Sequence, residues 1–295
     1  MFAPGLALLA LLISAIALAD GLRNSFQSLP RPAAASQVGS TDLKAEILNA
    51  KLLADRRLLV SLKISDAKGA PLELDDLDAN SIKFIVAAIK TKQNGESSYR
   101  NYILSRVSGK EYQYKGERKK PNLVETTQPD FDQGGQLTKI KPGIFTYTFK
   151  TALPANYDRN ATHVIASELT RWKGKYVVNP IFEFVPSGGK VRLRRTVESA
   201  SCNNCHDPLN YHGGTRREVG YCALCHTSQL SDPETGESLD FKVLVHKIHR
   251  GRLLPSVREG KPFFIVGENQ RIADYSTVRY PQALSSDGNY KDLRN

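Results

Sequence analysis

All four cysteines of this 295-residue chain lie between residues 202 and 225, in two segments of the form C-x-x-C-H. This spacing is the attachment signature of c-type haem. The two thiols of each segment bond one porphyrin, and the following histidine supplies a nitrogen to the iron. The sequence therefore predicts two covalently held haems c. Their attachment residues are Cys202, Cys205, His206, Cys222, Cys225 and His226.

Two other interpretations of the same cysteines compete with haem. Sixteen residues separate Cys205 from Cys222, a gap that suits a structural four-cysteine zinc site. Zinc does not explain why a histidine follows each cysteine pair. Disulfides within each pair would close small, strained rings. Haem is therefore favoured, and an exported binding domain with a structural zinc site is the alternative.

Three further histidines are candidates for the second axial position of each iron. They are His212, His246 and His249, in a chain with six histidines altogether. Imidazole on both faces of the iron gives a closed site that suits electron transfer, whereas an open sixth position would indicate a haem enzyme. His212 follows His206 so closely that we expect it to serve the neighbouring haem. His246 and His249 share one face of a helix predicted over 240–248.

The N-terminus has the features of an export signal. An apolar run from Leu6 to Leu18 leads to the small-x-small sequence Ala17-Leu18-Ala19, and it is short for a membrane span. We expect a signal peptide over 1–19 and a flexible leader over 20–41. Because c-type haem is attached outside the cytoplasm, the predicted location is the periplasm, the outer membrane or the extracellular surface.

Residues 42–196 have the period-two pattern of β-strands. Leu58, Val60, Leu62 and Ile64 alternate with more polar residues, and Ile82 to Ile89 is nearly continuously apolar, as in a strand covered on both faces. Further strands are expected near 144–149, 163–169, 176–178 and 181–185. Short strands between Gly, Pro and Asp clusters predict an antiparallel Ig-like sandwich or split barrel. Residues 43–53 fit helix or strand, and 103–137 look like a long polar excursion.

The chain as a whole is 40% hydrophobic and 24% charged, which is typical of a folded protein. For residues 197–295, however, the sequence pattern predicts little regular secondary structure. The helix at 240–248 is the one element that the pattern there predicts. Side chains alone would not build an ordinary core from such a region. We therefore expect a haem-packed, mostly irregular domain with short helices.

The formal net charge of +11 favours acidic partners, but nucleic acid is not expected for an exported chain. Arg192, Arg194 and Arg195 precede the haem region and are either propionate partners or an exposed strand edge. A second basic group surrounds Tyr112 and Tyr114 and suits an anionic partner or a solvated loop. It consists of Lys110, Lys115, Arg118, Lys119 and Lys120.

Several segments together resemble the OmcA/MtrC family of decahaem c-type cytochromes. They are Cys202 to Leu209, His212-Gly213-Gly214, Arg216 to Tyr221, Asp232 to Gly236, Asp240-Phe241-Lys242 and His246-Lys247-Ile248-His249-Arg250-Gly251, within a match over 200–251. The resemblance implies an electron-transfer protein rather than an enzyme, part of an extracellular conduit. Its implied partners are other multihaem cytochromes or an outer-membrane conduit, with flavins or metal oxides as acceptors. Two motifs in place of ten imply the N-terminal portion of such a protein.

Overall fold

The structure is a computed structural model that describes residues 42–79, 81–195, 197–206 and 208–280. It also describes the backbone of two short paired strands, β16 (Gln282–Leu284) and β17 (Tyr290–Asp292). The predicted signal peptide and leader lie outside the described residues. No helix in the described ranges is long and apolar enough to cross a membrane.

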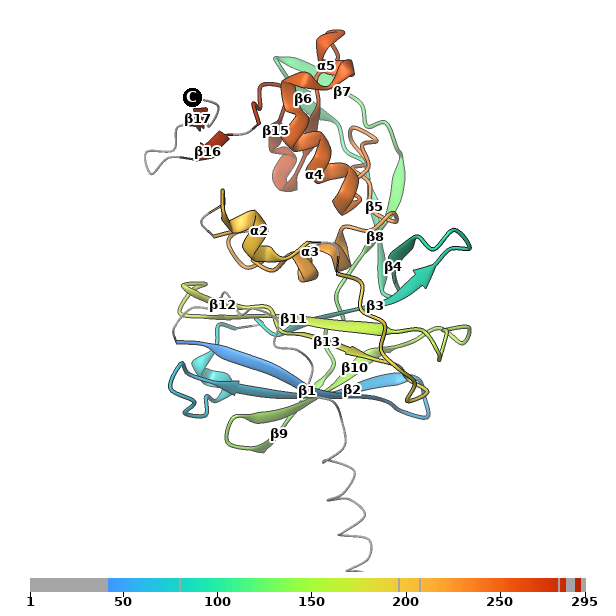
Figure 1. Cartoon of the computed structure of the whole chain (residues 1–295), viewed down its shortest axis with the longest axis vertical. Coiled ribbons are helices and arrows are strands. Elements are labelled where there is room, and N and C mark those ends of the chain that lie inside the picture. Colours follow the sequence, from blue (N-terminus) through green and yellow to red (C-terminus); the bar gives the residue numbers. More distant parts are fainter. Residues whose placement is uncertain are drawn as a thin grey trace, which may run out of the picture. The chain divides into compact units, whose positions relative to one another are not determined.

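Two antiparallel sheets form the N-terminal part (Figure 1). The first has the order β1-β2-β10-β9, with strands Lys44–Leu52, Arg57–Ser65, Ile144–Ala152 and Gln136–Lys141. The second has the order β12-β11-β3-β4, with strands Tyr176–Val178, His163–Arg171, Lys83–Thr91 and Ser97–Asn101; β13 (Ile181–Phe184) also pairs with β11. Residues 43–53, which fitted helix or strand, are therefore mainly strand β1.

The main core lies between these two sheets. Alternate residues of β2 are buried, as are Phe145 and Phe149 of β10. They pack against the facing residues Phe84 and Val86 of β3 and Ile165 of β11. The mainly antiparallel β-fold expected from the sequence is confirmed, and its two separate sheets make it a sandwich.

Strands β3 and β11 are buried on both faces, as the continuous apolar run at 82–89 predicted. Phe84 and Val86 face the inter-sheet core, whereas Ile85 and Ala87 belong to a second cluster on the outer face. Helix α3 (Val219–Cys225) covers this outer face with three buried residues, Tyr221, Ala223 and Leu224. The sandwich therefore supports the second cysteine motif directly.

The polar excursion at 103–137 contains a long two-stranded arm. We define the arm as residues 104–129. It contains the pair β5 (Leu104–Ser108) with β8 (Glu125–Pro129), and the hairpin of β6 (Tyr112–Tyr114) with β7 (Glu117–Lys119). In Figure 1 the arm runs from the sandwich along the side of the cysteine-containing region to its far end. Polar residues suit the arm because most of its side chains are partly or fully exposed.

The C-terminal part has more short elements than the sequence pattern predicted. The helices are α2 (Ser199–Asn203), α3, α4 (Phe241–Arg250) and α5 (Pro255–Arg258), and β14 (Phe264–Val266) pairs with β15 (Ile272–Asp274). Three 3-10 turns complete the described elements: η1 (Leu74–Asp76), η2 (Gly251–Leu253) and η3 (Glu268–Gln270). Helix α4 is the predicted helix, capped by the Asp240 side chain, which accepts hydrogen bonds from Lys242 N and Val243 N.

His163 of β11 is fully buried inside the sandwich. Its Nδ1 lies 2.9 Å from the Ala161 carbonyl, which identifies Nδ1 as the protonated nitrogen; Nε2 then accepts from the Tyr102 hydroxyl at 3.0 Å. Burial is the main effect and lowers the pKa of His163, with Lys90 contributing in the same direction, while the Ala161 carbonyl and Asp158 oppose the shift. The imidazole is therefore neutral at pH 7.

Because His163 is buried, we expect the sandwich to become less stable as the pH falls. Because the pKa of His163 is lower in the folded state, the unfolded chain takes up the proton first as the pH falls below about 6.5. Stability is then lost, by at most about 1.4 kcal/mol per pH unit from this group. His163→Gln keeps one donor and one acceptor without a titrating group, so its urea unfolding should change less between pH 7.5 and 5 than that of the wild type. Equal pH dependence of both chains would contradict this role.

Candidate haem-binding site

The second cysteine motif is fixed by helix α3 on the sandwich. Tyr221 and Leu224 are fully buried against the second sheet. Asn101, at the end of β4, donates from its side-chain amide to the Leu224 carbonyl at 2.8 Å. His226 directly follows the helix, and its backbone N–H donates to the Cys222 carbonyl at 2.9 Å. The position of this histidine therefore follows from the packing of α3.

The first cysteine motif is tied to the second by one hydroxyl group. Ser199 Oγ, in the first turn of α2, donates to Glu218 Oε2 at 2.7 Å and accepts from Val219 N at 2.9 Å. Glu218 and Val219 begin α3. Since α2 carries Cys202, this contact holds the two attachment segments next to one another.

Four of the predicted histidines form two facing pairs. The ring centroids of His206 and His249 are 6.2 Å apart, and those of His212 and His226 are 6.0 Å apart. Nδ1 of His226 lies 2.9 Å from the Leu239 carbonyl, and Nδ1 of His249 lies 2.7 Å from the Val245 carbonyl. A carbonyl on Nδ1 leaves Nε2 as the nitrogen that can bind a metal.

These spacings fit an iron atom between two imidazoles. A metal about 2.0 Å from each ligating nitrogen separates the ring centroids by about 6 Å. Each pair joins one motif histidine to one histidine from outside the motifs. All four cysteines are free thiols, as covalent attachment of a porphyrin requires. The residues present therefore fit two haems c.

His246 has no such partner among the described residues. It lies on α4 with its side chain exposed, and its Nδ1 is 2.6 Å from the Lys242 carbonyl in the preceding turn. The structure thus brings four of the five candidate axial histidines into pairs and leaves His246 facing neither motif histidine.

Burial favours the neutral imidazole at His206, His212 and His226. It lowers the pKa of His212 to about 4, with Arg216 and His226 contributing in the same direction. Burial is also the largest cause of the lowered pKa of His206 and His226. Neutral imidazole is the form that binds a metal. Burial raises the pKa of the Cys222 thiol to about 11 and that of Cys225 to about 12, so both are protonated at neutral pH.

The zinc alternative requires the cysteine thiolates to converge on one point. Within the ranges that the structure describes, which include all four cysteines, no three His, Cys, Asp or Glu side chains form a group that could hold a metal ion. The four-cysteine arrangement is therefore not formed in this fold.

A tight loop presents His212 to His226. We define the His212 loop as residues 211–217. It is closed by a β-bridge between Tyr211 and Arg216, and its three residues from His212 to Gly214 have φ values of 51°, 70° and 90°. Left-handed backbone is unfavourable for a residue with a side chain, and Gly213 and Gly214 allow it at the next two positions. The left-handed backbone of this loop therefore explains why two glycines follow His212 in the sequence.

Arg216 is a residue for which the sequence motifs predicted no role of its own. Its Nε donates to Glu168 Oε2, in β11, at 3.1 Å. Of the three arginines considered as propionate partners, Arg194 and Arg195 make other side-chain contacts. Arg194 donates to the Ser97 carbonyl and lies over the Tyr99 ring, and Arg195 pairs with Glu198. The Arg192 backbone N–H donates to Thr162.

The arm is held by the loop at residues 232–236. Asp232 is buried and accepts hydrogen bonds from Glu234 N, Thr235 Oγ1 and Val266 N. Backbone N–H groups of the arm, at Asn122 and Leu123, donate to carbonyls of this loop at 2.9 Å. The Asp-Pro-Glu-Thr-Gly sequence thus has a structural role, which is to dock the arm on the cysteine-containing region.

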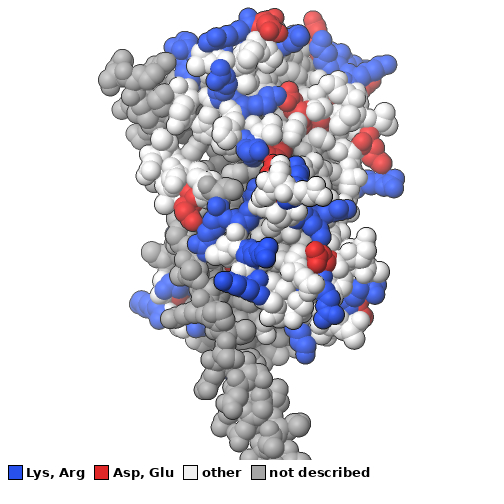
Figure 2. Space-filling model, turned by 45° about the vertical axis from the view of Figure 1, so that its right-hand side comes forward, with Lys and Arg blue, Asp and Glu red and all other residues white. Residues whose placement is uncertain are grey.

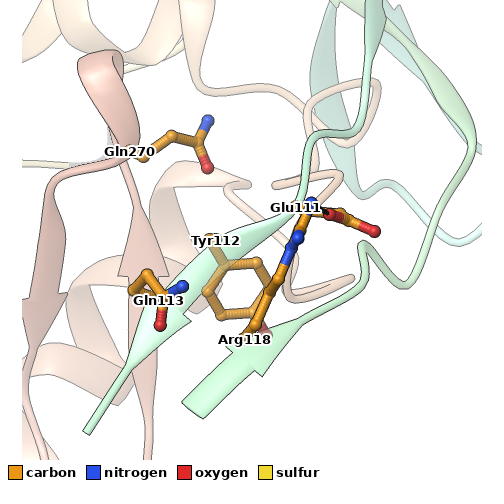
Figure 3. Close-up of a pocket in the computed structure, with 5 residues that line it drawn as sticks. All are labelled: Glu111, Tyr112, Gln113, Arg118 and Gln270. Atoms are coloured by element: carbon orange, nitrogen blue, oxygen red, sulfur yellow. Dashed lines mark ion pairs between the residues drawn. The ribbon is translucent and has the colours of Figure 1, made fainter. Parts of the chain in front are cut away.

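The basic group near Tyr112 and Tyr114 lies mostly on the arm hairpin. Tyr114 stacks on Phe264 with centroids 4.1 Å apart, and its hydroxyl donates to Asp274. Figure 3 shows a pocket of about 390 Å³ beside this hairpin, lined by Glu111, Tyr112, Gln113, Arg118 and Gln270. The charged groups of this pocket, Arg118 and Glu111, pair with each other. The space-filling view shows lysines and arginines spread widely over one face, with acidic residues between them (Figure 2).

Residues 194–286 match the family model described as "Outer membrane cytochrome MtrC/MtrF-like, domains II/IV". Over this part, which contains both cysteine motifs, the chain is therefore similar to outer-membrane cytochromes. The chain is 33% identical over 136 residues to the multiheme cytochrome MtrC of Shewanella baltica (strain OS185). That alignment covers 42% of this chain and 20% of the relative, so this chain matches a fifth of that protein's length.

Solved structures agree on the fold. The outer membrane decaheme cytochrome OmcA matches with a TM-score of 0.69 and 24% identity, over 82% of this chain and 38% of that chain. MtrC from Shewanella baltica OS185 matches with a TM-score of 0.50 and 20% identity, over 72% of this chain and 34% of that chain. The chain is therefore similar to OmcA and MtrC cytochromes, in sequence over part of its length and in fold, as the sequence motifs suggested. These relatives are named as outer-membrane cytochromes, which agrees with the exported location predicted from the sequence.

Proposed function

We propose that this chain binds two haems c and transfers electrons as part of an extracellular conduit. Cys202, Cys205 and His206 hold the first haem, with His249 as its distal ligand. The second haem is held by Cys222, Cys225 and His226, with His212 as its distal ligand. The observation that carries the proposal is the pair of centroid distances, 6.2 and 6.0 Å, between motif and distal histidines.

The bound irons would supply one-electron chemistry between the ferric and ferrous states, with no open position for a substrate. The residues of the chain have three tasks. The cysteines would hold the porphyrins, and the histidines would supply the nitrogen ligands of each iron. The Ser199–Glu218 hydrogen bond keeps the two attachment segments adjacent, so that the redox centres are neighbours.

Other multihaem cytochromes or an outer-membrane conduit are the proposed partners, with flavins or metal oxides as terminal acceptors. The names of the relatives support this role, since they are outer-membrane and multihaem cytochromes. The activity proposed is electron transfer rather than enzymatic conversion of a bound substrate. His246 is proposed as an axial ligand that serves neither of these two irons.

The test is intact mass combined with the visible spectrum, after export from a host with haem-attachment machinery. We expect a mass increase of two haems and a low-spin, six-coordinate spectrum. The double substitution Cys202→Ser and Cys205→Ser should remove one haem, as should the same changes at Cys222 and Cys225. A folded, colourless protein at the bare polypeptide mass would refute haem binding, and one zinc per chain in that protein would establish the alternative.

A further inference from the structure

The most buried ion pair among the described residues joins the sandwich to the His212 loop. Glu168 lies on β11 with its side chain 6% exposed, and Arg216 has a side chain that is 19% exposed. Their contact is a direct hydrogen bond from Nε to Oε2 at 3.1 Å. A charge pair at this depth interacts much more strongly with nearby charges than a surface pair does.

Arg216 is coupled to the position of His212 through the backbone. The N–H and carbonyl of Arg216 bond to the carbonyl and N–H of Tyr211, which closes the loop around His212. The side chain of Asn179 holds the same loop, since it donates to the Thr215 carbonyl and accepts from Arg217 N. The sandwich therefore fixes the distal histidine through two side chains, Glu168 and Asn179.

The pair also contacts the segment that carries the second cysteine motif. The Tyr221 hydroxyl donates to Glu168 Oε2 at 3.5 Å, one residue before Cys222. The Arg216 guanidinium lies 5.1 Å from the centroid of Phe131, and Phe131 stacks on Tyr221. Burial is the largest cause of the lowered pKa of His212 and His226, and the positive charge of Arg216 is a further cause in both.

We propose that Glu168 and Arg216 are positioning residues that set the reduction potential of the second haem. This inference rests on the proposed function. Reduction adds an electron, so a nearby guanidinium favours the ferrous state and raises the potential, whereas a nearby carboxylate lowers it. In the native pair the carboxylate offsets part of the effect of the guanidinium.

The two charges predict shifts of opposite sign. Arg216→Gln removes the cation and should lower the potential of one haem. Glu168→Gln leaves Arg216 without its counter-charge and should raise that potential. We expect each change to alter the ratio of reduced to oxidised iron about tenfold, which is about 59 mV for a one-electron couple. Arg216→Lys keeps the charge and should lie closer to the wild type than Arg216→Gln does.

The experiment is a spectroelectrochemical titration of the full chain carrying both haems. The same substitutions in the Cys202→Ser, Cys205→Ser chain assign the shifts to the second haem. Arg171→Gln is the matched control, because Arg171 is a partly buried arginine at the C-terminal end of β11, on the opposite face of the strand from Glu168, where it pairs with Asp76. This control should leave both potentials unchanged.

The outcomes separate this inference from the proposed function. Opposite shifts at one haem support the inference, and shifts of the same sign would show a structural role and overturn it. Unmoved potentials in a protein that holds two haems would also overturn it while leaving the proposed function intact. Absence of haem would refute the proposed function itself. If Arg216→Gln does not fold, a failure of Glu168→Gln to raise the potential is sufficient to reject the inference.

Discussion

Replacement of His212 with alanine is expected to open the sixth position of one of the two haems. The reason is that His212 faces His226 at a centroid distance of 6.0 Å, and no other histidine is paired with His226 in the described residues. Loss of an axial imidazole converts a closed low-spin iron into one with a vacant position. The ferric spectrum should show a high-spin component, and the ferrous protein should bind carbon monoxide at one haem.

The histidines of helix α4 offer a matched comparison. His249→Ala should open the other haem, because His249 faces His206. His246→Ala, three residues earlier on the same helix, should leave both haems low-spin and unreactive toward carbon monoxide. If His246→Ala opened a haem, or if His212→Ala left both closed, the proposed pairing of ligands would be wrong.

The parts of the fold that the sequence predicted depend on local chemistry. Strand alternation is visible because successive side chains of β2 and β10 point to opposite faces, and one face is buried. The run at 82–89 indicated a strand covered on both sides because its outer face carries Ile85 and Ala87, which pack under α3. The attachment motifs are equally local, since five consecutive residues contain two thiols and an imidazole.

The short helices could not be predicted from the pattern. Helices α2 and α3 have five and seven residues, and helices of this length are unstable without tertiary contacts. The buried residues Tyr221, Ala223 and Leu224 supply those contacts for α3 on the outer face of the second sheet. Segments of five to seven residues contain at most two helical turns, so a hydrophobic period of 3.6 residues cannot be recognised in them.

The contacts that join distant parts of the chain were also invisible in the sequence. Glu168 and Arg216 are 48 residues apart, and Asn101 and Leu224 are 123 residues apart. No separate role for Arg216 could be predicted among the 41 basic residues of the chain. Its buried ion pair depends on the register of β11, which places Glu168 opposite the His212 loop. Arg192, Arg194 and Arg195 were considered instead, and the side chains of Arg194 and Arg195 make other contacts in the fold.

Asp132 is a buried residue where the chain, after the arm, rejoins the sandwich. Its side chain is 1% exposed in total and accepts three hydrogen bonds: from Tyr147 Oη at 2.8 Å and from Lys150 N and Thr151 N at 2.9 Å. Its own backbone N–H donates to the Phe84 carbonyl at 2.8 Å. The carboxylate thus joins the end of the excursion to β10.

Asp132→Ala should lower the free energy of unfolding by about 3–5 kcal/mol, because one buried donor and two partly buried donors lose their acceptor at once. Asp66→Ala is the control: Asp66 also accepts from two backbone N–H groups, Lys68 and Ala70, but in an exposed turn, so about 1 kcal/mol is expected. Urea unfolding compares the two variants. A loss at Asp132 no larger than at Asp66 would mean that water replaces the missing carboxylate. Phe131 is adjacent to Asp132 and contacts Arg216 and Tyr221. A large loss of stability would therefore also disturb these contacts, and we expect the reduction potential of the second haem to change in this variant.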